Sequence, residues 1–270
     1  MVRADALQLR FIGPIIELLF PGSKAMSIIE GHIKHLQKEL DYKNEAGNQR
    51  RFARYWGSHP NIHIPKVLWS SPTVLVTQWS DNIPLRDVIN SAPDSPLYSI
   101  RSLAGENLLN FTLSNPGALG LVHGDPHPGN FRISSDGKIL TVLDFGAVAQ
   151  EDGFTELFAL AALAMHHNEP AAINYAHQCW SQKGWLDPKV SVEDFIKLLT
   201  SDTKPHAEDC FTFSGDWVNQ EASKWLSPSA GLEDIQQVKM PPAALLEHRA
   251  LTGNIALCCQ LKSNIPLENY

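Results

Sequence analysis

The first segment with a regular pattern of apolar positions begins at a capping box, Ser27-Ile-Ile-Glu30. In such a box the serine hydroxyl accepts a backbone N–H bond and the glutamate reaches back to the serine N–H. Apolar residues then recur at helical spacing as far as Trp56, weaken near Asp41, and end at Gly57. We therefore predict one long helix or two consecutive helices over residues 27–56.

Two runs rich in β-branched and aromatic residues follow, at residues 62–69 and 73–79. A short Ser-Ser-Pro turn separates them, which predicts an antiparallel hairpin. Helical patterns begin again at Leu85 and continue to Leu113. We expect Asn115-Pro116-Gly117 to stop the last of these helices, because proline and glycine both disfavour a helix interior.

The local composition changes at residues 121–130, Leu-Val-His-Gly-Asp-Pro-His-Pro-Gly-Asn. So much proline and glycine predicts neither helix nor strand there. A second hairpin is predicted from Phe131–Ile133 and Ile139–Leu143, around a Ser-Ser-Asp-Gly turn. Beyond Glu151 the apolar pattern is helical throughout, at residues 154–166, 170–182, 191–199 and 241–262. This order of elements predicts an α+β fold whose second half is mostly helical.

Composition narrows the class of protein. The chain has 270 residues, of which 43% are hydrophobic and 19% charged, as in an ordinary globular protein. Its net charge of −7 offers no basic field, so we exclude nucleic acid as a partner. The four cysteines are too scattered for a disulfide framework. The apolar run Leu157–Met165 is far shorter than the roughly 20 residues of a membrane-spanning helix. We expect a cytoplasmic protein without its own membrane span, with peripheral contact at the inner face of a membrane left open.

Three polar residues carry the strongest chemical signal. Asn130 lies five residues after Asp125, and Asp144 opens an Asp-Phe-Gly at the end of the second predicted hairpin. Protein kinases place a catalytic aspartate, an asparagine and a metal-binding aspartate at this spacing. Asn130 and Asp144 supply the oxygen ligands that Mg²⁺ prefers, and Asp125 can act as base or orienter for an attacking hydroxyl or water. Each residue alone is also an ordinary turn former, but their joint occurrence favours a kinase-like site.

Two histidines of the same segment invite a metal interpretation. His123 and His127 are four residues apart and would share one face of a helix, where they could hold zinc. Pro126 and Pro128 exclude that helix. We therefore expect His123 to hydrogen-bond loop backbone.

Several stretches together resemble the UbiB/AarF family of atypical kinases. They are Glu39-Leu-Asp-Tyr-Lys-Asn-Glu45-Ala46, Ile64-Pro-Lys-Val67, the strand ending at Thr77-Gln-Trp79, His123-Gly-Asp-Pro-His-Pro-Gly-Asn130 and Leu143-Asp-Phe-Gly146. The resemblance covers residues 27–150 clearly and 240–262 faintly, the latter through Pro241, Pro242, Leu245 and Arg249. The proline after Asp125 favours this family over the aminoglycoside and choline kinases, which stay open as an alternative of small-molecule phosphotransferase type.

The resemblance implies a bilobal, protein-kinase-like fold that binds ATP with Mg²⁺ and serves isoprenoid quinone or lipid metabolism. It also implies a partner from the lipid or quinone pathway. Its implied catalytic residues are Asp125 together with Glu39 and Asp41 of the family's E-x-D motif, and its implied nucleotide-binding residues are Glu45, Gln78, Trp79, Asn130 and Asp144, with Asn130 and Asp144 as metal ligands. On composition alone, an exposed helix face is the favoured interpretation of Glu39, Asp41 and Glu45, and the downstream Asp125 motif reverses that preference.

The chain departs from the family pattern before Glu39. The K-x-G-Q motif, the alanine-rich nucleotide loop and the lysine-bearing strand are not found in residues 1–38. We expect a partial N-lobe over residues 1–79 and a helical C-lobe over 80–270, in a fragment, a gene remnant or a protein that lost part of the lobe. Because that lysine holds the phosphates in kinases, the chain alone is expected to bind Mg·ATP weakly, and a pseudoenzyme or binding module is the second hypothesis.

Overall fold

A computed structural model describes residues 42–150, 153, 157, 160–161, 164, 169–203, 210–217, 219 and 242–266. Its first half holds α3 (Tyr42–Trp56), β1 (Ile62–His63), β2 (Val67–Ser70), β3 (Leu75–Thr77), β4 (Ile83–Pro84), α4 (Leu85–Ile89), the 3₁₀ turn η1 (Pro96–Tyr98) and α5 (Arg101–Leu119). Its second half holds β5 (Leu121–His123), η2 (Pro128–Asn130), β6 (Phe131–Ile133), β7 (Leu140–Val142), β8 (Val148–Gln150), α7 (Pro170–Gln182), α8 (Val192–Thr203), β9 (Cys210–Thr212), α11 (Pro242–Leu261) and β10 (Asn264–Pro266). The predicted mixture of α and β elements is confirmed.

The first described helix, α3, confirms the predicted helix over residues 42–56. Its buried positions are Ala46, Gln49, Phe52 and Trp56, which recur at intervals of three and four residues and so share one face. The helix ends at Trp56, directly before Gly57, as predicted. Residues 27–41, including the capping box, lie outside the described part of the chain.

The first predicted hairpin is only partly correct. β2 and β3 form the antiparallel pair, with Val67 opposite Thr77. The predicted strand over 62–69 is wrong, because β1 leaves the hairpin and pairs in parallel with β7, Ile62 lying opposite Leu140. Pro65 lies between β1 and β2, and proline has no backbone N–H to donate to a strand ladder.

The second predicted hairpin is confirmed and forms the centre of a four-stranded sheet in the order β1-β7-β6-β4. β6 and β7 are antiparallel, with Phe131 opposite Val142. The connection between them contains Gly137, whose φ of +76° lies in the left-handed region that glycine adopts without a steric cost. All three residues of β7 are buried.

Four strands of three residues each, β5, β8, β9 and β10, were not predicted. Leu121–His123, expected to be loop, is β5, which pairs with β8. Beyond Glu151, where only helices were expected, β9 pairs with β10. Each of these strands has three residues, too few for a periodic pattern, and each depends on a partner that is distant in the sequence.

The predicted stop at Asn115-Pro116-Gly117 is also wrong, because α5 continues to Leu119 and is followed by Gly120 at φ +62°. A proline this close to the helix end removes a single backbone hydrogen bond. Asn115 is buried, and its Oδ1 accepts a 2.7 Å hydrogen bond from the indole N–H of Trp56. This tertiary contact favours continuation of the helix at the residue where the sequence suggested an end.

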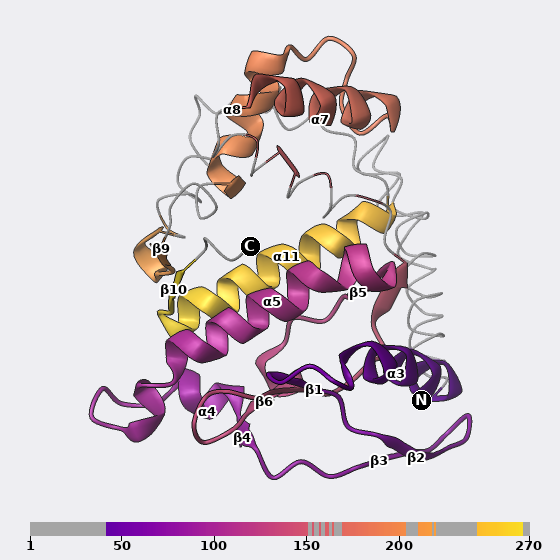
Figure 1. The fold of residues 1–270 in the computed structure, drawn as a ribbon, viewed down its shortest axis with the longest axis vertical. Coiled ribbons are helices and arrows are strands. Elements are labelled where there is room, and N and C mark those ends of the chain that lie inside the picture. Colours follow the sequence, from indigo (N-terminus) through magenta and orange to yellow (C-terminus); the bar gives the residue numbers. More distant parts are fainter. Residues whose placement is uncertain are drawn as a thin grey trace, which may run out of the picture.

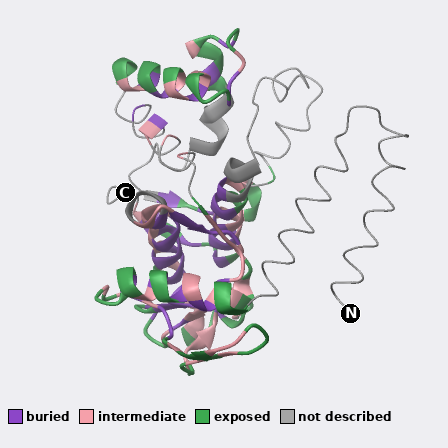
Figure 2. Ribbon diagram, turned by 90° about the vertical axis from the view of Figure 1, so that its right-hand side faces the viewer, coloured by how far each residue is buried: buried purple, intermediate pink, exposed green. Residues whose placement is uncertain are grey.

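The core is built around α5 and α11, which lie side by side (Figure 1). Buried side chains from α3, α5, α11 and the four-stranded sheet form one cluster, and Figure 2 shows this buried layer between exposed outer surfaces. A second cluster includes Trp180 and Trp185 near α7 and Phe195 of α8, and it reaches α11 through Leu251. The predicted helices at 170–182, 191–199 and 241–262 are confirmed within a few residues, whereas most of 154–166 lies outside the described residues.

Within the described ranges, every helix is too short or too polar to cross a membrane.

Candidate functional site

The segment that follows β5 forms a compact loop closed by η2, and it holds two of the predicted site residues. The Nδ2 of Asn130 donates a 2.6 Å hydrogen bond to Oδ2 of Asp125 and a second one, at 3.2 Å, to the Asp125 carbonyl oxygen. Within η2, the backbone N–H of Asn130 also donates to the His127 carbonyl at 2.9 Å. The five-residue spacing therefore brings the aspartate and the asparagine into direct contact.

His123, the last residue of β5, ties this loop to the Asp-Phe-Gly segment. Its Nε2 lies 2.6 Å from the carbonyl oxygen of Asp144. A carbonyl only accepts, so Nε2 carries the proton, and the buried Nδ1 has no partner within the described residues. Burial lowers the pKa of His123 because it disfavours the imidazolium form. The expectation that His123 bonds loop backbone is confirmed.

An aromatic cluster surrounds the His123 ring. The rings of Phe52, Phe111, Phe131 and Phe145 lie with their centroids 5.4–6.4 Å from that of the imidazole. These phenylalanines come from α3, α5, β6 and the Asp-Phe-Gly segment, and each is at most 1% exposed. The loop that carries Asp125 is thus anchored by a histidine embedded in the main core.

Asp144 itself has an unusual backbone. Its φ of +57° lies in the left-handed region, which non-glycine residues seldom adopt and which asparagine and aspartate tolerate best. Its Oδ1 accepts a 3.0 Å bond from the backbone N–H of Gly146, while the residue as a whole is exposed. The backbone N–H of Leu143 donates to the Asn130 carbonyl at 2.7 Å, which places Asp144 beside the loop of Asp125 and Asn130.

Helix α3 holds the Asp-Phe-Gly segment from the other side. Oε1 of Glu45 accepts a 3.4 Å bond from the backbone N–H of Phe145. Nδ2 of Asn48 donates to the Phe145 carbonyl at 3.1 Å. The ring of Phe145 packs on Phe52, with the centroids 5.0 Å apart. Glu45 and Asn48 therefore bond both backbone polar groups of Phe145, the residue directly after Asp144.

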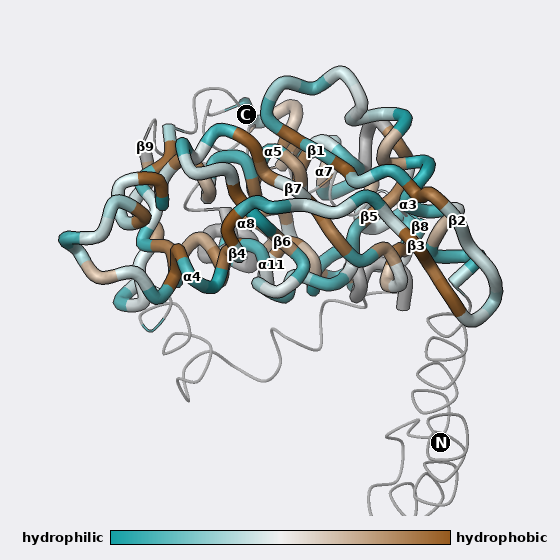
Figure 3. Tube along the Cα trace, turned by 90° about the horizontal axis from the view of Figure 1, so that it is seen from below, coloured by the Kyte–Doolittle hydropathy of each residue, from teal (hydrophilic) through white to brown (hydrophobic). Residues whose placement is uncertain are grey.

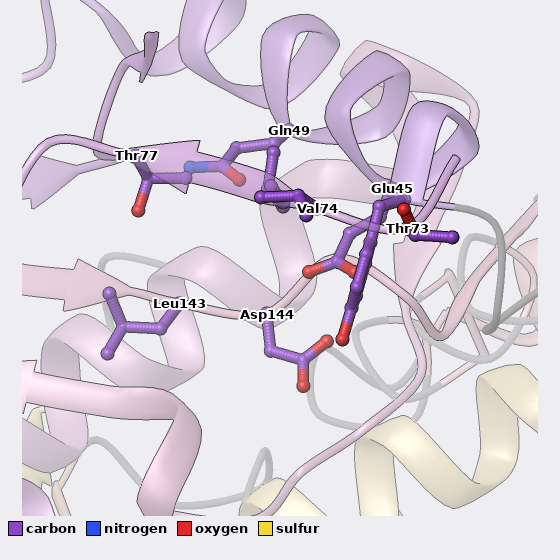
Figure 4. A pocket seen from close by; sticks show the side chains of 9 residues that line it. Glu45, Gln49, Thr73, Val74, Thr77, Leu143 and Asp144 are labelled. Atoms are coloured by element: carbon purple, nitrogen blue, oxygen red, sulfur yellow. The ribbon is translucent and has the colours of Figure 1, made fainter. Parts of the chain in front are cut away.

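A pocket of about 390 Å³ lies between α3, the β2–β3 hairpin and the Asp-Phe-Gly segment. It is lined by Tyr42, Glu45, Gln49, Thr73, Val74, Leu75, Thr77, Leu143 and Asp144. Figure 4 shows the carboxyl groups of Glu45 and Asp144 pointing into the same space, with Thr73 and Val74 of the hairpin opposite α3. A charged ligand in this pocket would meet both carboxylates.

The remaining predicted site residues lie elsewhere. Gln78 and Trp79 follow β3 and are not among the residues lining this pocket. The backbone N–H of Gln78 donates to the Lys66 carbonyl at 2.8 Å. Trp79 is 77% exposed, and its indole N–H donates to Asp81 at 2.7 Å. Glu39 and Asp41 lie outside the described residues.

Sequence reasoning missed two contributors to the site. Asn48 falls inside the range of the resemblance, residues 27–150, but nothing in the local pattern reveals its contact with Phe145. Arg249 of α11 reaches Asp125, with Nη2 3.3 Å from Oδ1. The faint resemblance over 240–262 marked Arg249 without indicating its partner, which is 124 residues away in the chain.

A loop aspartate bonded to an asparagine, followed by an Asp-Phe-Gly segment under a glutamate-bearing helix, is the arrangement of a protein-kinase-like site. The sequence agrees, because residues 1–175 match the ABC1 atypical kinase-like domain. The chain belongs to this family, which confirms the resemblance to UbiB/AarF kinases and favours it over the aminoglycoside and choline kinases.

Named relatives support the same assignment. The chain is 32% identical over 164 residues to an uncharacterized aarF domain-containing protein kinase of Arabidopsis thaliana, covering 57% of this chain and 22% of the relative. It is 28% identical over 202 residues to ACTIVITY OF BC1 COMPLEX KINASE 3 of the same plant, covering 72% of this chain and 27% of the relative. Both relatives are named as chloroplastic proteins. The chain thus spans about a quarter of the length of these relatives.

A solved structure supports the fold. The complex of Rv3197 with erythromycin from Mycobacterium tuberculosis superposes with a TM-score of 0.80 at 26% identity, covering 99% of this chain and 66% of that one. The predicted protein-kinase-like fold is therefore confirmed.

Proposed function

We propose that this chain is the nucleotide-binding part of an atypical kinase or ATPase of the UbiB/AarF type that uses Mg·ATP. The hydrogen-bonded pair of Asp125 and Asn130, placed beside Asp144, is the observation that carries the proposal. Membership of the ABC1 family and relatives named as kinases support it.

The donor set fits a magnesium ion. Asn130 bonds Asp125 through Nδ2, which leaves its amide oxygen as a possible metal ligand, and the exposed Asp144 contributes a carboxylate. Mg²⁺ prefers few protein oxygens together with substrate phosphates. Asn130 and Asp144 would hold the ion, whose charge, when it is bound, neutralises the phosphates.

The other residues have separate tasks in this proposal. Asp125 orients the attacking hydroxyl or water and accepts its proton. His123 takes no part in proton transfer, because burial lowers its pKa and its N–H is committed to the Asp144 carbonyl. Glu45 accepts from the Phe145 N–H and so helps to hold Asp144 in its left-handed conformation.

A second candidate, a pseudoenzyme or binding module, is favoured by the charge of the pocket. Among the described residues, the nine that line it include Glu45 and Asp144 but neither lysine nor arginine. A polyanionic nucleotide would meet like charge there, which disfavours binding. Turnover by the chain alone is therefore expected to be weak, and equilibrium binding is the better first measurement.

The experiment is a titration of the full 270-residue chain with Mg·ATP by calorimetry, with and without Mg²⁺. We expect binding that requires Mg²⁺, is lost in Asp144→Asn and is retained in the matched control Asp136→Asn, which alters a turn aspartate bonded to Ser134. Binding that is indifferent to Mg²⁺ and to Asp144→Asn would contradict the proposal. Phosphate release that is lost in Asp144→Asn identifies an enzyme, and binding without release identifies a binding module.

At the level of physiology we propose a role in isoprenoid quinone or lipid metabolism, with a partner from that pathway at a membrane surface. The support is the resemblance to UbiB/AarF kinases. The test measures quinone content in a strain that lacks the gene and is complemented by the parent chain or by Asp144→Asn. Equal rescue by both chains would contradict a nucleotide-dependent role.

A further inference from the structure

The C-terminal helix α11 delivers a cation to the loop that carries Asp125. Nη2 of Arg249 lies 3.3 Å from Oδ1 of Asp125, whose other oxygen, Oδ2, receives the bond from Asn130. The Arg249 side chain is 56% exposed and that of Asp125 is 32% exposed. Both are therefore open to a ligand that approaches from solvent.

Close packing between α11 and the loop of Asp125 fixes the position of Arg249. Gly253 lies one helical turn after Arg249 and so on the same face of α11. A Cβ atom at Gly253 would overlap Cγ of Pro126, the residue after Asp125. Helix and loop are thus in van der Waals contact at a position where only glycine fits. On the core side, Leu251 and Leu257 of α11 are at most 3% exposed.

The charge balance of the site explains why a cation is needed here. Residues 121–131, which include the whole loop, contain no lysine or arginine. Asp125 and Asp144 are negative, and a nucleotide would add the charge of its terminal phosphate. Kinase-like enzymes stabilise that phosphate with cationic groups. A guanidinium has five N–H donors, and the contact with Asp125 uses one of them.

We propose that Arg249 binds the terminal phosphate of a nucleoside triphosphate while it holds the Asp125 carboxylate beside that phosphate. This inference rests on the proposed function, and it adds a specificity: Arg249 distinguishes a triphosphate from a diphosphate. Asn130 and Asp144 act on the nucleotide through the metal and do not by themselves create that distinction.

The test compares affinities at equilibrium and does not require turnover. The full chain is titrated with Mg²⁺ and either the non-hydrolysable β,γ-imido analogue of ATP or ADP. Arg249→Gln is expected to weaken binding of the triphosphate analogue about tenfold to hundredfold, which is the cost of one charge-assisted hydrogen bond. The same variant should change the affinity for ADP less than about threefold. Arg249→Lys should fall between Arg249→Gln and the parent chain, because a point charge remains but the planar fork is lost.

Lys197→Gln is the matched control, because Lys197 is an exposed cation that pairs with Glu193 at 3.1 Å on α8. It should bind both nucleotides as the parent does. An equal loss of affinity for both nucleotides in Arg249→Gln, or no loss of affinity for either, would overturn the inference. A parent chain that binds neither nucleotide would overturn the proposed function as well. If Arg249→Gln does not fold, Arg249→Lys decides, since an unchanged preference for the triphosphate overturns the inference.

Discussion

Two structures border the proposed nucleotide site, and they differ in how they are supported. The loop of Asp125 is anchored through His123, which is 4% exposed and surrounded by four phenylalanine rings. The β2–β3 hairpin on the other side is a two-stranded sheet, and its Leu68 and Trp69 are 66% and 55% exposed. Figure 3 shows the hydrophobic colour of this hairpin at one edge of the described chain.

The difference separates the residues proposed to carry the chemistry from the residues that enclose the pocket. The aspartates and Asn130 depend on a dense core, so their geometry is tied to the global stability of the domain. The hairpin supplies Thr73, Val74, Leu75 and Thr77 to the pocket without a core of its own, and two-stranded sheets are marginal by themselves. Disturbing the core should therefore affect the whole protein, whereas disturbing the hairpin should act locally.

The largest expected effect is in the aromatic cluster. Phe52→Ala removes a fully buried ring that contacts Phe145 and Phe111, and it should lower the free energy of unfolding by about 3–5 kcal/mol. Trp69→Ala on the hairpin should lower it by about 0.5 kcal/mol or less, since the side chain is largely exposed. Urea unfolding measures both. Similar losses in the two variants would refute the contrast between core and hairpin.

The next effect concerns the contact between α11 and the loop. Gly253→Ala places a methyl group against Pro126 and should lower the free energy of unfolding by about 1–3 kcal/mol. Gly47→Ala in α3 is the control, because nothing lies within 4 Å of its added Cβ. That variant should be more stable by about 0.5–1 kcal/mol, from helix propensity. Thermal unfolding compares them, and a stabilised Gly253→Ala would contradict the close packing.

His123 gives the anchored loop a dependence on pH. Burial lowers its folded pKa below the unfolded value of about 6.5, so below that pH the unfolded state binds a proton that the folded state resists. Stability should fall as the pH drops through about 6.5, with a contribution of up to about 1.4 kcal/mol per pH unit. In urea unfolding, the free energy of unfolding of His123→Phe should fall less steeply with decreasing pH than that of the parent, although its overall stability is lower. An equally steep fall in the variant and in the parent would contradict the assignment of this pH dependence to His123.

The smallest effect isolates the backbone of Asp144. Asp144→Asn and Asp144→Ala both remove the charge, but alanine adopts a φ of +57° with more strain. We expect Asp144→Ala to be less stable than Asp144→Asn by about 1 kcal/mol and Asp144→Gly to tolerate the same φ freely. Chemical unfolding of the three variants ranks them. Equal stabilities for alanine and glycine would show that the left-handed conformation imposes no strain.

The three site residues that the spacing of the motif identified lie close together in the chain. Asp125 and Asn130 are five residues apart, and Asp144 follows the next hairpin, so local chain geometry alone brings them near one another. Glu45 was assigned through the resemblance, and the structure places it in the same pocket as Asp144. The roles of all four residues remain predictions.

The sequence by itself determined α3 from residue 42 onward, the β6–β7 hairpin, the helices α7, α8 and α11, and the aspartate–asparagine motif. Period and spacing are local properties, and local properties can be read from the chain. Only the tertiary structure decided that β1 pairs with β7, that α5 runs past Pro116, and that Arg249 meets Asp125. Each of these depends on the free energy of packing against a segment distant in the chain, which no window of the sequence contains.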